Sequence, residues 1–208
     1  MNPIDALPER ELIERARHDR TAFGALFEKH FDGIFGYVYR RTGDWDAACD
    51  ITSEVFVNAL EHIGGFRWTG TPFSAWLFRI ATNQLRMYFR TGKRRASMLQ
   101  SFSAEHATST GNQELTEREV AERELAAAEG FARAQAALLQ LPVKYQEVLA
   151  LRYFEQKSNE EIAAILEKPG GTIKSLMSRG LELLRRELAA PQPRERSGIA
   201  SPTPQHTN

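Results

Sequence analysis

The chain has 208 residues, of which 42% are hydrophobic, and its 27 basic and 27 acidic residues give a formal net charge of zero. The single cysteine excludes a disulfide framework, and the five histidines lack metal-ligand spacing, so we expect no metal or other cofactor. Without a signal peptide or a membrane-length apolar run, the sequence predicts a soluble, cytoplasmic protein with no membrane insertion.

In the first half of the chain, apolar residues recur at steps of three and four, which predicts helices and no strands. We expect these helices over residues 9–17, 22–42, 45–63 and 72–90. Thr21, Asp44 and Thr71 are the expected N-terminal caps of the second, third and fourth helices. Gly43 and the pair Gly64–Gly65 are expected to end the second and third helices.

The second half begins with a stretch rich in Ser, Thr and Ala over residues 97–113, which predicts a linker. Residues 114–129 are acidic and have a weak apolar face, so a marginal helix or a tether is expected there. The next predicted helices cover residues 131–141, 142–154, 158–167 and 172–188. Ser158 and Glu161 have the spacing of a capping box. Residues 191–208 are typical of a disordered tail.

The last two predicted helices form a helix-turn-helix candidate, because a short capped helix is followed by a Gly-containing turn and a longer helix. The outward side chains of that longer helix are small or basic, and such groups bind base edges and phosphates. The alternative is an ordinary helical hairpin. The candidate DNA-binding residues are Thr172, Lys174, Ser175, Ser178 and Arg179.

The stretch from residue 62 to residue 104 contains no Asp or Glu. Its basic residues are Arg67, Arg79, Arg86, Arg90, Lys93, Arg94 and Arg95, and its aromatic residues are Phe66, Trp68, Phe73, Trp76, Phe78, Tyr88 and Phe89. Basic side chains neutralise phosphates and aromatic rings stack on unpaired bases, which favours a surface for nucleic acid, including single strands. The alternative is that most of these aromatic rings are helix core.

We find no constellation that supports catalysis. Glu160 and Glu161 are explained by helix capping, and Cys49 lies among apolar positions that predict a packed rather than a nucleophilic thiol. The two Gly-Gly pairs lack the context of a phosphate-binding loop. The sequence therefore predicts that the protein is not an enzyme.

Seven short segments resemble the extracytoplasmic-function (ECF) subgroup of bacterial RNA polymerase sigma factors. They occur in the family's order, and the resemblance covers about residues 12–95 and 134–188. The segments are residues 22–27, 50–56 and 75–83 in the first half, and Leu141–Pro142, Glu147–Leu149, Glu160–Ala163 and Gly171–Ser175 in the second half.

The resemblance implies an all-α fold of two small domains, joined by a flexible linker. Sigma region 2 would cover residues 8–97, an acidic linker 98–130, sigma region 4 with its helix-turn-helix 131–190, and the tail 191–208. The implied partners are bacterial core RNA polymerase, promoter DNA in duplex and melted form, and an anti-sigma factor. The helix-turn-helix would read the promoter's −35 element.

The resemblance also implies roles for residues of the first domain. Asp50, Ser53 and Glu54 would contact core polymerase. The −10 element would be captured and its backbone followed by Phe66, Arg67, Trp68, Asn83, Arg86, Arg90, Lys93, Arg94 and Arg95.

Three positions depart from the family pattern, namely Ser53, Asn159 and Leu176. Leu176 stands where a basic residue is usual, and we expect it to extend the apolar stripe rather than touch a thymine methyl. The main rival function is a stand-alone helix-turn-helix regulator, which would need its own dimer interface. A nucleic-acid-processing enzyme would need metal ligands or a nucleophile–base pair that we do not find.

Overall fold

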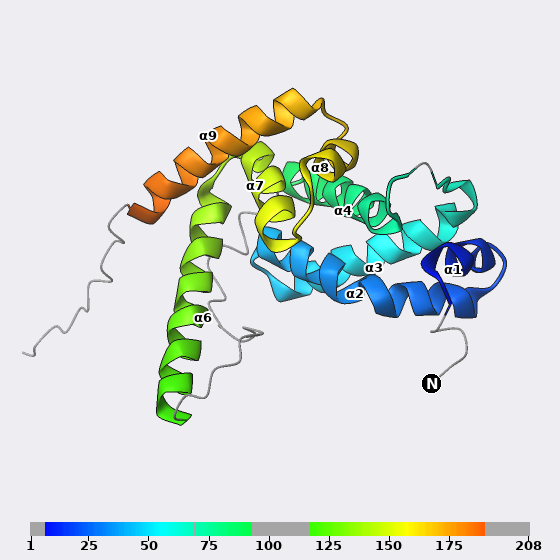
Figure 1. Cartoon of the computed structure of the whole chain (residues 1–208), viewed down its shortest axis with the longest axis horizontal. Helices are drawn as coiled ribbons and strands as arrows, with labels where there is room; N and C mark the ends of the chain where they lie inside the picture. Colours follow the sequence, from blue (N-terminus) through cyan, green and yellow to red (C-terminus); the bar gives the residue numbers. More distant parts are fainter. Residues whose placement is uncertain (1–6, 69, 93–116, 190–208) are drawn as a thin grey trace, which may run out of the picture.

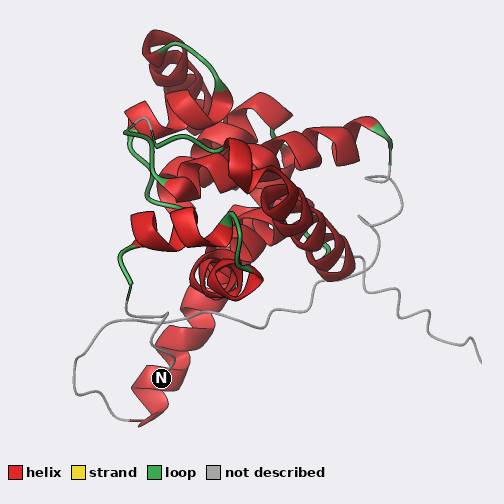
Figure 2. Cartoon of the chain, turned by 90° about the vertical axis from the view of Figure 1, so that its right-hand side faces the viewer, coloured by secondary structure: helices red, strands yellow, loops and turns green. Residues whose placement is uncertain are grey.

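The computed structural model describes residues 7–68, 70–92 and 117–189, with side chains in the last range described from residue 129. Every regular element in these ranges is helical and none is a strand (Figure 2). This confirms the predicted all-α fold. No helix among the described residues combines the length and the apolarity that crossing a membrane requires. Residues 98–116 of the expected linker 98–130, the tail 191–208 and the cluster Lys93–Arg95 lie outside the described residues.

Helix α2 is the centre of the first half, since it packs against α1, α3 and α4. The apolar faces of these helices bury Leu26, Ile34, Val55, Phe73 and Leu77 almost completely. The elements are α1 (Glu9–Ala16), α2 (Arg20–Thr42), α3 (Trp45–His62), the 3-10 turn η1 (Ile63–Gly65) and α4 (Phe73–Arg90).

The caps of these helices confirm some predictions and correct others. Asp44 caps α3 by accepting a hydrogen bond from the Ala47 amide at 3.1 Å, and Gly43 ends α2 with φ of 66°. The predicted cap Thr21 is wrong, because Asp19 has the extended backbone and its Oδ1 accepts from the Thr21 amide at 2.8 Å. The predicted start at Thr71 is also wrong, because α4 begins after Pro72 without a side-chain cap.

The second half consists of α6 (Glu117–Gln140), α7 (Val143–Leu149) with its π-helical continuation η2 (Ala150–Phe154), α8 (Asn159–Leu166) and α9 (Gly170–Ala189). Helix α6 is one continuous helix where the sequence predicted a marginal helix or tether over residues 114–129 and a separate helix over residues 131–141. It projects from the body of the molecule (Figure 1). The capping box of Ser158 and Glu161 is present as predicted. Helix α9 starts two residues before the predicted Thr172, because the Thr172 and Ile173 amides already donate to the Pro169 carbonyl.

The two halves share one continuous buried cluster, which includes Leu85 from the first half and Leu138 and Val148 from the second. Helix α8 packs on α4, while α6 and η2 pack on α2 (Figure 1). The contact places the helix-turn-helix candidate directly beside the basic, aromatic helix α4.

His30 of α2 gives the folded chain a pH dependence. Its Nε2 lies 2.8 Å from Glu9 Oε1, and its ring packs on Phe73 at 5.6 Å between centroids. Burial lowers the pKa of His30 below its ordinary value and outweighs the opposing effect of Glu9. The unfolded chain therefore binds the proton more readily, so the free energy of unfolding should fall as the pH drops through and below the ordinary histidine range.

In urea titrations at about pH 7.5 and 5.5, the His30→Gln variant should lose less stability between the two pH values than the wild type. The exposed His18→Gln variant should behave like the wild type and serves as the control. An equal loss in His30→Gln and wild type would remove His30 as the cause.

Candidate nucleic-acid interface

Helix α9 presents the predicted recognition residues to solvent. Its buried side rests on Ile173 and on Gly180, where an added Cβ would lie 3.3 Å from the Leu149 side chain. Gly180 therefore permits close packing of α9 on α7. All five predicted contacts, namely Thr172, Lys174, Ser175, Ser178 and Arg179, are exposed. The arrangement can bind phosphates and base edges along one helix face.

Two details of α9 refine the predicted contacts. Leu176 is half-buried and packs against the core, as expected for an extension of the apolar stripe. The Thr172 amide donates to the Pro169 carbonyl at 2.9 Å, so that amide is not free for a phosphate. Only the Thr172 hydroxyl stays available at this position.

The loop that leads to α4 divides its two large aromatic residues between core and surface. The Phe66 side chain is buried, at 7% exposed, and packs on Phe73 and Trp76 at 5.3 and 5.2 Å between ring centroids. Arg17 fixes the loop by donating to the Phe66 carbonyl at 2.8 Å. Trp68 is 43% exposed. Of the two rings, Trp68 is therefore the one that can stack on a base without unfolding the loop.

Helix α4 brings three predicted DNA contacts to one side, but two of them are already hydrogen-bonded. Asn83 and Arg90 are exposed. Arg86 donates through Nε and Nη2 to the two carboxylate oxygens of Glu147 at 2.8 and 3.0 Å, and through Nη1 to Asn83 at 3.2 Å. The bonds to Glu147 raise the pKa of Arg86, so its charge is constant. Arg86, for which the resemblance implied a contact with the −10 element, is thus already paired with a carboxylate of helix α7.

Most of the remaining aromatic rings of the acid-free stretch belong to the core, as the alternative interpretation held. Phe73 and Phe78 are buried, while Trp76, Tyr88 and Phe89 are partly buried against the same cluster. The local concentration of positive charge persists at the surface, where Arg67 and Arg90 are exposed. The stretch therefore contributes mainly positive charge to a nucleic-acid surface, because most of its aromatic rings are buried or partly buried.

Helix α3 has one polar outer face. Asp50, Ser53 and Glu54 are all exposed there, and the Ser53 hydroxyl donates to the Cys49 carbonyl at 2.8 Å. Cys49 is itself exposed, so the expectation of a packed thiol is wrong. Its neighbours Ala48 and Ile51 are buried, and the helical turn carries Cys49 to the other side.

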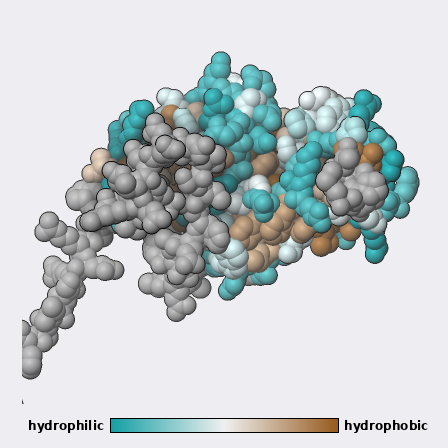
Figure 3. Space-filling model, turned by 60° about the horizontal axis from the view of Figure 1, so that its bottom comes forward, coloured by the Kyte–Doolittle hydropathy of each residue, from teal (hydrophilic) through white to brown (hydrophobic). Residues whose placement is uncertain are grey.

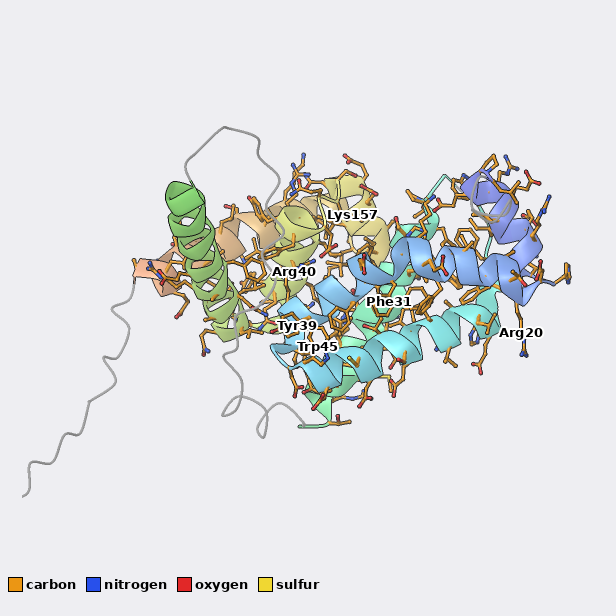
Figure 4. The ribbon with its side chains drawn as sticks, turned by 90° about the horizontal axis from the view of Figure 1, so that it is seen from below. Arg20, Phe31, Tyr39, Arg40, Trp45 and Lys157 are labelled. Carbon is orange, nitrogen blue, oxygen red and sulfur yellow. The ribbon has the colours of Figure 1, made fainter. Side chains whose placement is uncertain are left out.

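A strip of aromatic rings beside this face is a feature that the predicted apolar steps of three and four did not separate from the core. Rings spaced by four residues stack along α2 and meet α3 at Trp45, which is 55% exposed. Figure 3 shows an apolar patch on this side, and Figure 4 labels Phe31, Tyr39 and Trp45 within it. The strip comprises Phe27, Phe31, Phe35, Tyr39, Trp45 and Phe56. The spacing by four, separate from the buried row at Phe23, Leu26, Ile34 and Val38, is the signal that distinguishes it.

Both halves of the chain match sequence models of known protein families. The sequence model of Sigma-70 region 2 matches residues 26–95, and that of Sigma-70 region 4 matches residues 131–184. These two ranges contain α4 and most of α9, the helices that carry the candidate interface.

Three characterised relatives are similar over most of the chain. The ECF RNA polymerase sigma factor BldN of Streptomyces coelicolor is 33% identical over 88% of this chain and 67% of its own length. The RNA polymerase sigma-H factor of Pseudomonas aeruginosa is 31% identical, covering 86% and 93%. The ECF RNA polymerase sigma factor SigW of Bacillus subtilis is 29% identical, covering 89% and 98%.

Two solved structures have the same fold. The structure of CnrH in complex with the cytosolic domain of CnrY aligns with a TM-score of 0.61 at 23% identity, over 86% of this chain and 96% of CnrH. The sigma factor RpoE in complex with the anti-sigma factor NepR from Bartonella quintana aligns with a TM-score of 0.56 at 21% identity, over 80% and 96%.

Proposed function

The chain belongs to the ECF subgroup of the sigma-70 family, and from this premise we propose which of its surfaces meet promoter DNA and core RNA polymerase. A sigma factor is a dissociable, non-catalytic initiation subunit that directs bacterial RNA polymerase to specific promoters and promotes their melting. The observation that carries the assignment is the occurrence of regions 2 and 4, in order, on one chain. The stand-alone regulator is disfavoured, since it has no need of region 2.

We propose that α9 binds the −35 element. Lys174 and Arg179 supply the charge, and Thr172, Ser175 and Ser178 supply hydroxyl groups on the same exposed face. A recognition helix of this kind contacts base edges with its first residues and phosphates with its flanks. The boundaries 8–97, 98–130, 131–190 and 191–208 are the division of the chain that this role implies.

We propose that the loop before α4 and the outer face of α4 bind the melted −10 element. Trp68 offers an exposed ring for stacking, while Asn83 and Arg90 are the exposed polar groups beyond it. Phe66 supports the loop from inside, and Arg67 with the cluster Lys93–Arg95 adds charge for the DNA backbone. Extracting a base costs a few kcal/mol of stacking, which ring contacts offset.

We propose that core polymerase binds the polar face of α3 together with the aromatic strip beside it. The face supplies charge and hydrogen bonds through Asp50, Ser53 and Glu54, and the strip supplies apolar area. Aromatic anchors beside charged residues are the usual composition of such an interface. The protein would act in the cytoplasm, where the polymerase is. An anti-sigma factor would bind and restrain it, and the sigma factor RpoE of Bartonella quintana forms such a complex with the anti-sigma factor NepR.

The function is tested by titrating the purified chain against bacterial core RNA polymerase in competition with the primary sigma factor. Tight, competitive binding is expected. Absence of binding by well-folded components would leave a DNA regulator that acts without polymerase.

The polymerase face is tested by the double variant Asp50→Ala, Glu54→Ala. Loss of two interfacial charges should weaken core binding by about tenfold, or about 1.4 kcal/mol. Affinity is measured in the same competition titration. The Glu61→Ala variant removes an exposed charge from the end of the same helix and serves as the control. An equal, small effect of both variants would exclude this face.

A further inference from the structure

The loop between η1 and α4 is closed at its base by aromatic rings. Phe66 begins the loop and Phe73 is the first residue of α4, and their ring centroids lie 5.3 Å apart. Trp76, almost one turn further along α4, packs on both rings at 5.2 and 5.3 Å. Trp68 is exposed and meets the Phe66 ring edge-on at 6.4 Å. The rings therefore close the loop, and the backbone at Phe66 sets the direction in which Trp68 projects.

The backbone at Phe66 is held by Arg17, which directly follows α1. Arg17 Nη2 donates to the Phe66 carbonyl at 2.8 Å, across 49 positions of sequence. Its Nη1 lies 3.1 Å from Glu14 Oε2, so the guanidinium is oriented from within α1. The Nε of Arg17 is buried and has no acceptor in the part of the chain that the structure describes. Burial of an unpaired donor costs free energy, and the bonds to Phe66 and Glu14 outweigh that cost.

The other end of α1 is linked to the other end of the loop. Glu9, the first residue of α1, has its Oε1 2.8 Å from His30 Nε2, and the His30 ring packs on Phe73 at 5.6 Å between centroids. Between these two links, the buried side chains of Leu12 and Ile13 anchor α1 on α2. Helix α1 is thus connected to both ends of the loop that precedes α4 (Figure 1).

We propose that Arg17 is a positioning residue for promoter opening, because it holds the Phe66 carbonyl and thereby sets the direction in which Trp68 meets an unpaired base. The proposal rests on the proposed role of this loop in binding the −10 element. Arg17 acts through Phe66 and makes no contact with DNA in this role. A loop that is already ordered loses less conformational entropy when the strand binds, so the bond raises the affinity for the melted strand and favours opening.

The opening test follows permanganate footprinting over time with reconstituted holoenzyme, on a promoter selected from a randomised library. Arg17→Met removes the donor but keeps an unbranched side chain, and loss of one charged hydrogen bond should slow opening about fivefold. Arg17→Lys keeps a cationic donor and should recover most of the rate. Arg15→Met is the matched control, because Arg15 is exposed and pairs with Glu11 within α1. Equal opening rates of Arg17→Met and Arg15→Met would overturn the proposal.

Salt dependence distinguishes positioning from a direct contact of Arg17 with the DNA backbone. The probe is the fluorescently labelled non-template strand of the same promoter, titrated with holoenzyme at several salt concentrations. Loss of a phosphate contact would reduce the slope of log affinity against log salt by about 0.7. Loss of a positioning bond should weaken binding of this strand about fivefold and leave the slope unchanged. A reduced slope in Arg17→Met, and not in Arg15→Met, would make Arg17 a phosphate contact and contradict its positioning role.

The loop itself is observed in the free chain by fluorine NMR, with 5-fluorotryptophan at its three tryptophan positions. Single tryptophan-to-phenylalanine replacements assign the signals. Arg17→Met should shift and broaden the Trp68 signal, because the backbone at Phe66 loses its support, and Arg15→Met should leave that signal unchanged. Trp45 packs on Tyr39, at the far end of α2 from Arg20 (Figure 4), and its signal serves as the internal reference.

The outcomes separate this proposal from the proposed function. A Trp68 signal that is insensitive to Arg17→Met, in a chain that binds core polymerase, would contradict the role of Arg17 alone. A changed Trp68 signal with an unchanged opening rate would mean that Arg17 orders a loop that does not capture a base. The assignment of the loop to the −10 element and the role of Arg17 in opening would then both be wrong.

Discussion

Replacing both Lys174 and Arg179 by alanine is expected to weaken promoter binding by about 30-fold or more, because each lost contact to a base or phosphate costs roughly 1–3 kcal/mol. Both side chains are exposed on the face of α9 that carries the helix's hydroxyl groups. The folded structure should be unaffected, since neither side chain belongs to the buried cluster. The measurement is a titration of reconstituted holoenzyme on a promoter selected from a randomised library.

The matched control is Arg185→Ala, which removes one positive charge from an exposed position farther along the same helix. Its effect should be small and should vanish at higher salt, as for a remote charge. Core binding should be unchanged in both proteins. If the double variant and the control bind the selected promoter equally, α9 does not read the −35 element through these residues.

The second large effect concerns Phe66 and Trp68, the two aromatic residues of the loop before α4, whose replacements should change different properties. Phe66→Ala should lower the free energy of unfolding by about 3 kcal/mol, because it removes a buried ring from contact with Phe73 and Trp76. Trp68→Ala should leave stability nearly unchanged, yet reduce promoter opening about tenfold by removing a stacking surface of roughly 1–3 kcal/mol.

Stability is measured by denaturant unfolding, and opening by permanganate footprinting of the melted strand. Arg67→Ala is compared with Trp68→Ala, because it removes a neighbouring exposed charge without removing a ring, so any effect on opening beyond that of Arg67→Ala belongs to the Trp68 ring. Reduced opening in Trp68→Ala with normal core binding supports base capture by the loop. Normal promoter opening in Trp68→Ala would exclude Trp68 from base capture. The rings of this loop would then only stabilise the fold, as the expected stability loss in Phe66→Ala indicates.

Local signals in the sequence were enough to predict a helix end wherever neighbouring residues in the chain determine that end. Asp44 caps α3, Gly43 adopts the left-handed backbone, and Ser158 with Glu161 closes its capping box, because each partner lies within three or four residues. Apolar steps of three and four predicted the helices for the same reason. Where two candidates competed, as with Asp19 and Thr21, spacing alone did not choose between them.

Composition also identified the interface in outline. The exposed residues of α9 and the charge of the acid-free stretch follow from the sequence, because charged side chains stay in water wherever a helix has an outer face. The order of the motifs identified the family. Burial of individual rings was not determined in this way, since Phe66 and Trp68 differ by two positions in one loop and only their neighbours from α1 and α4 separate them.

The sequence by itself determined the helical fold, most of the helix ends and the membership of the sigma family, because these depend on periodicity and short motifs. The tertiary structure alone decided that Glu147 lies on Arg86, that Arg41 is buried against Gln146, and that Phe27 and Trp45 of the aromatic strip stay exposed. These contacts join residues that are 61 and 105 positions apart. No local preference specifies such pairs; they form only when burial of the shared core brings the two halves together.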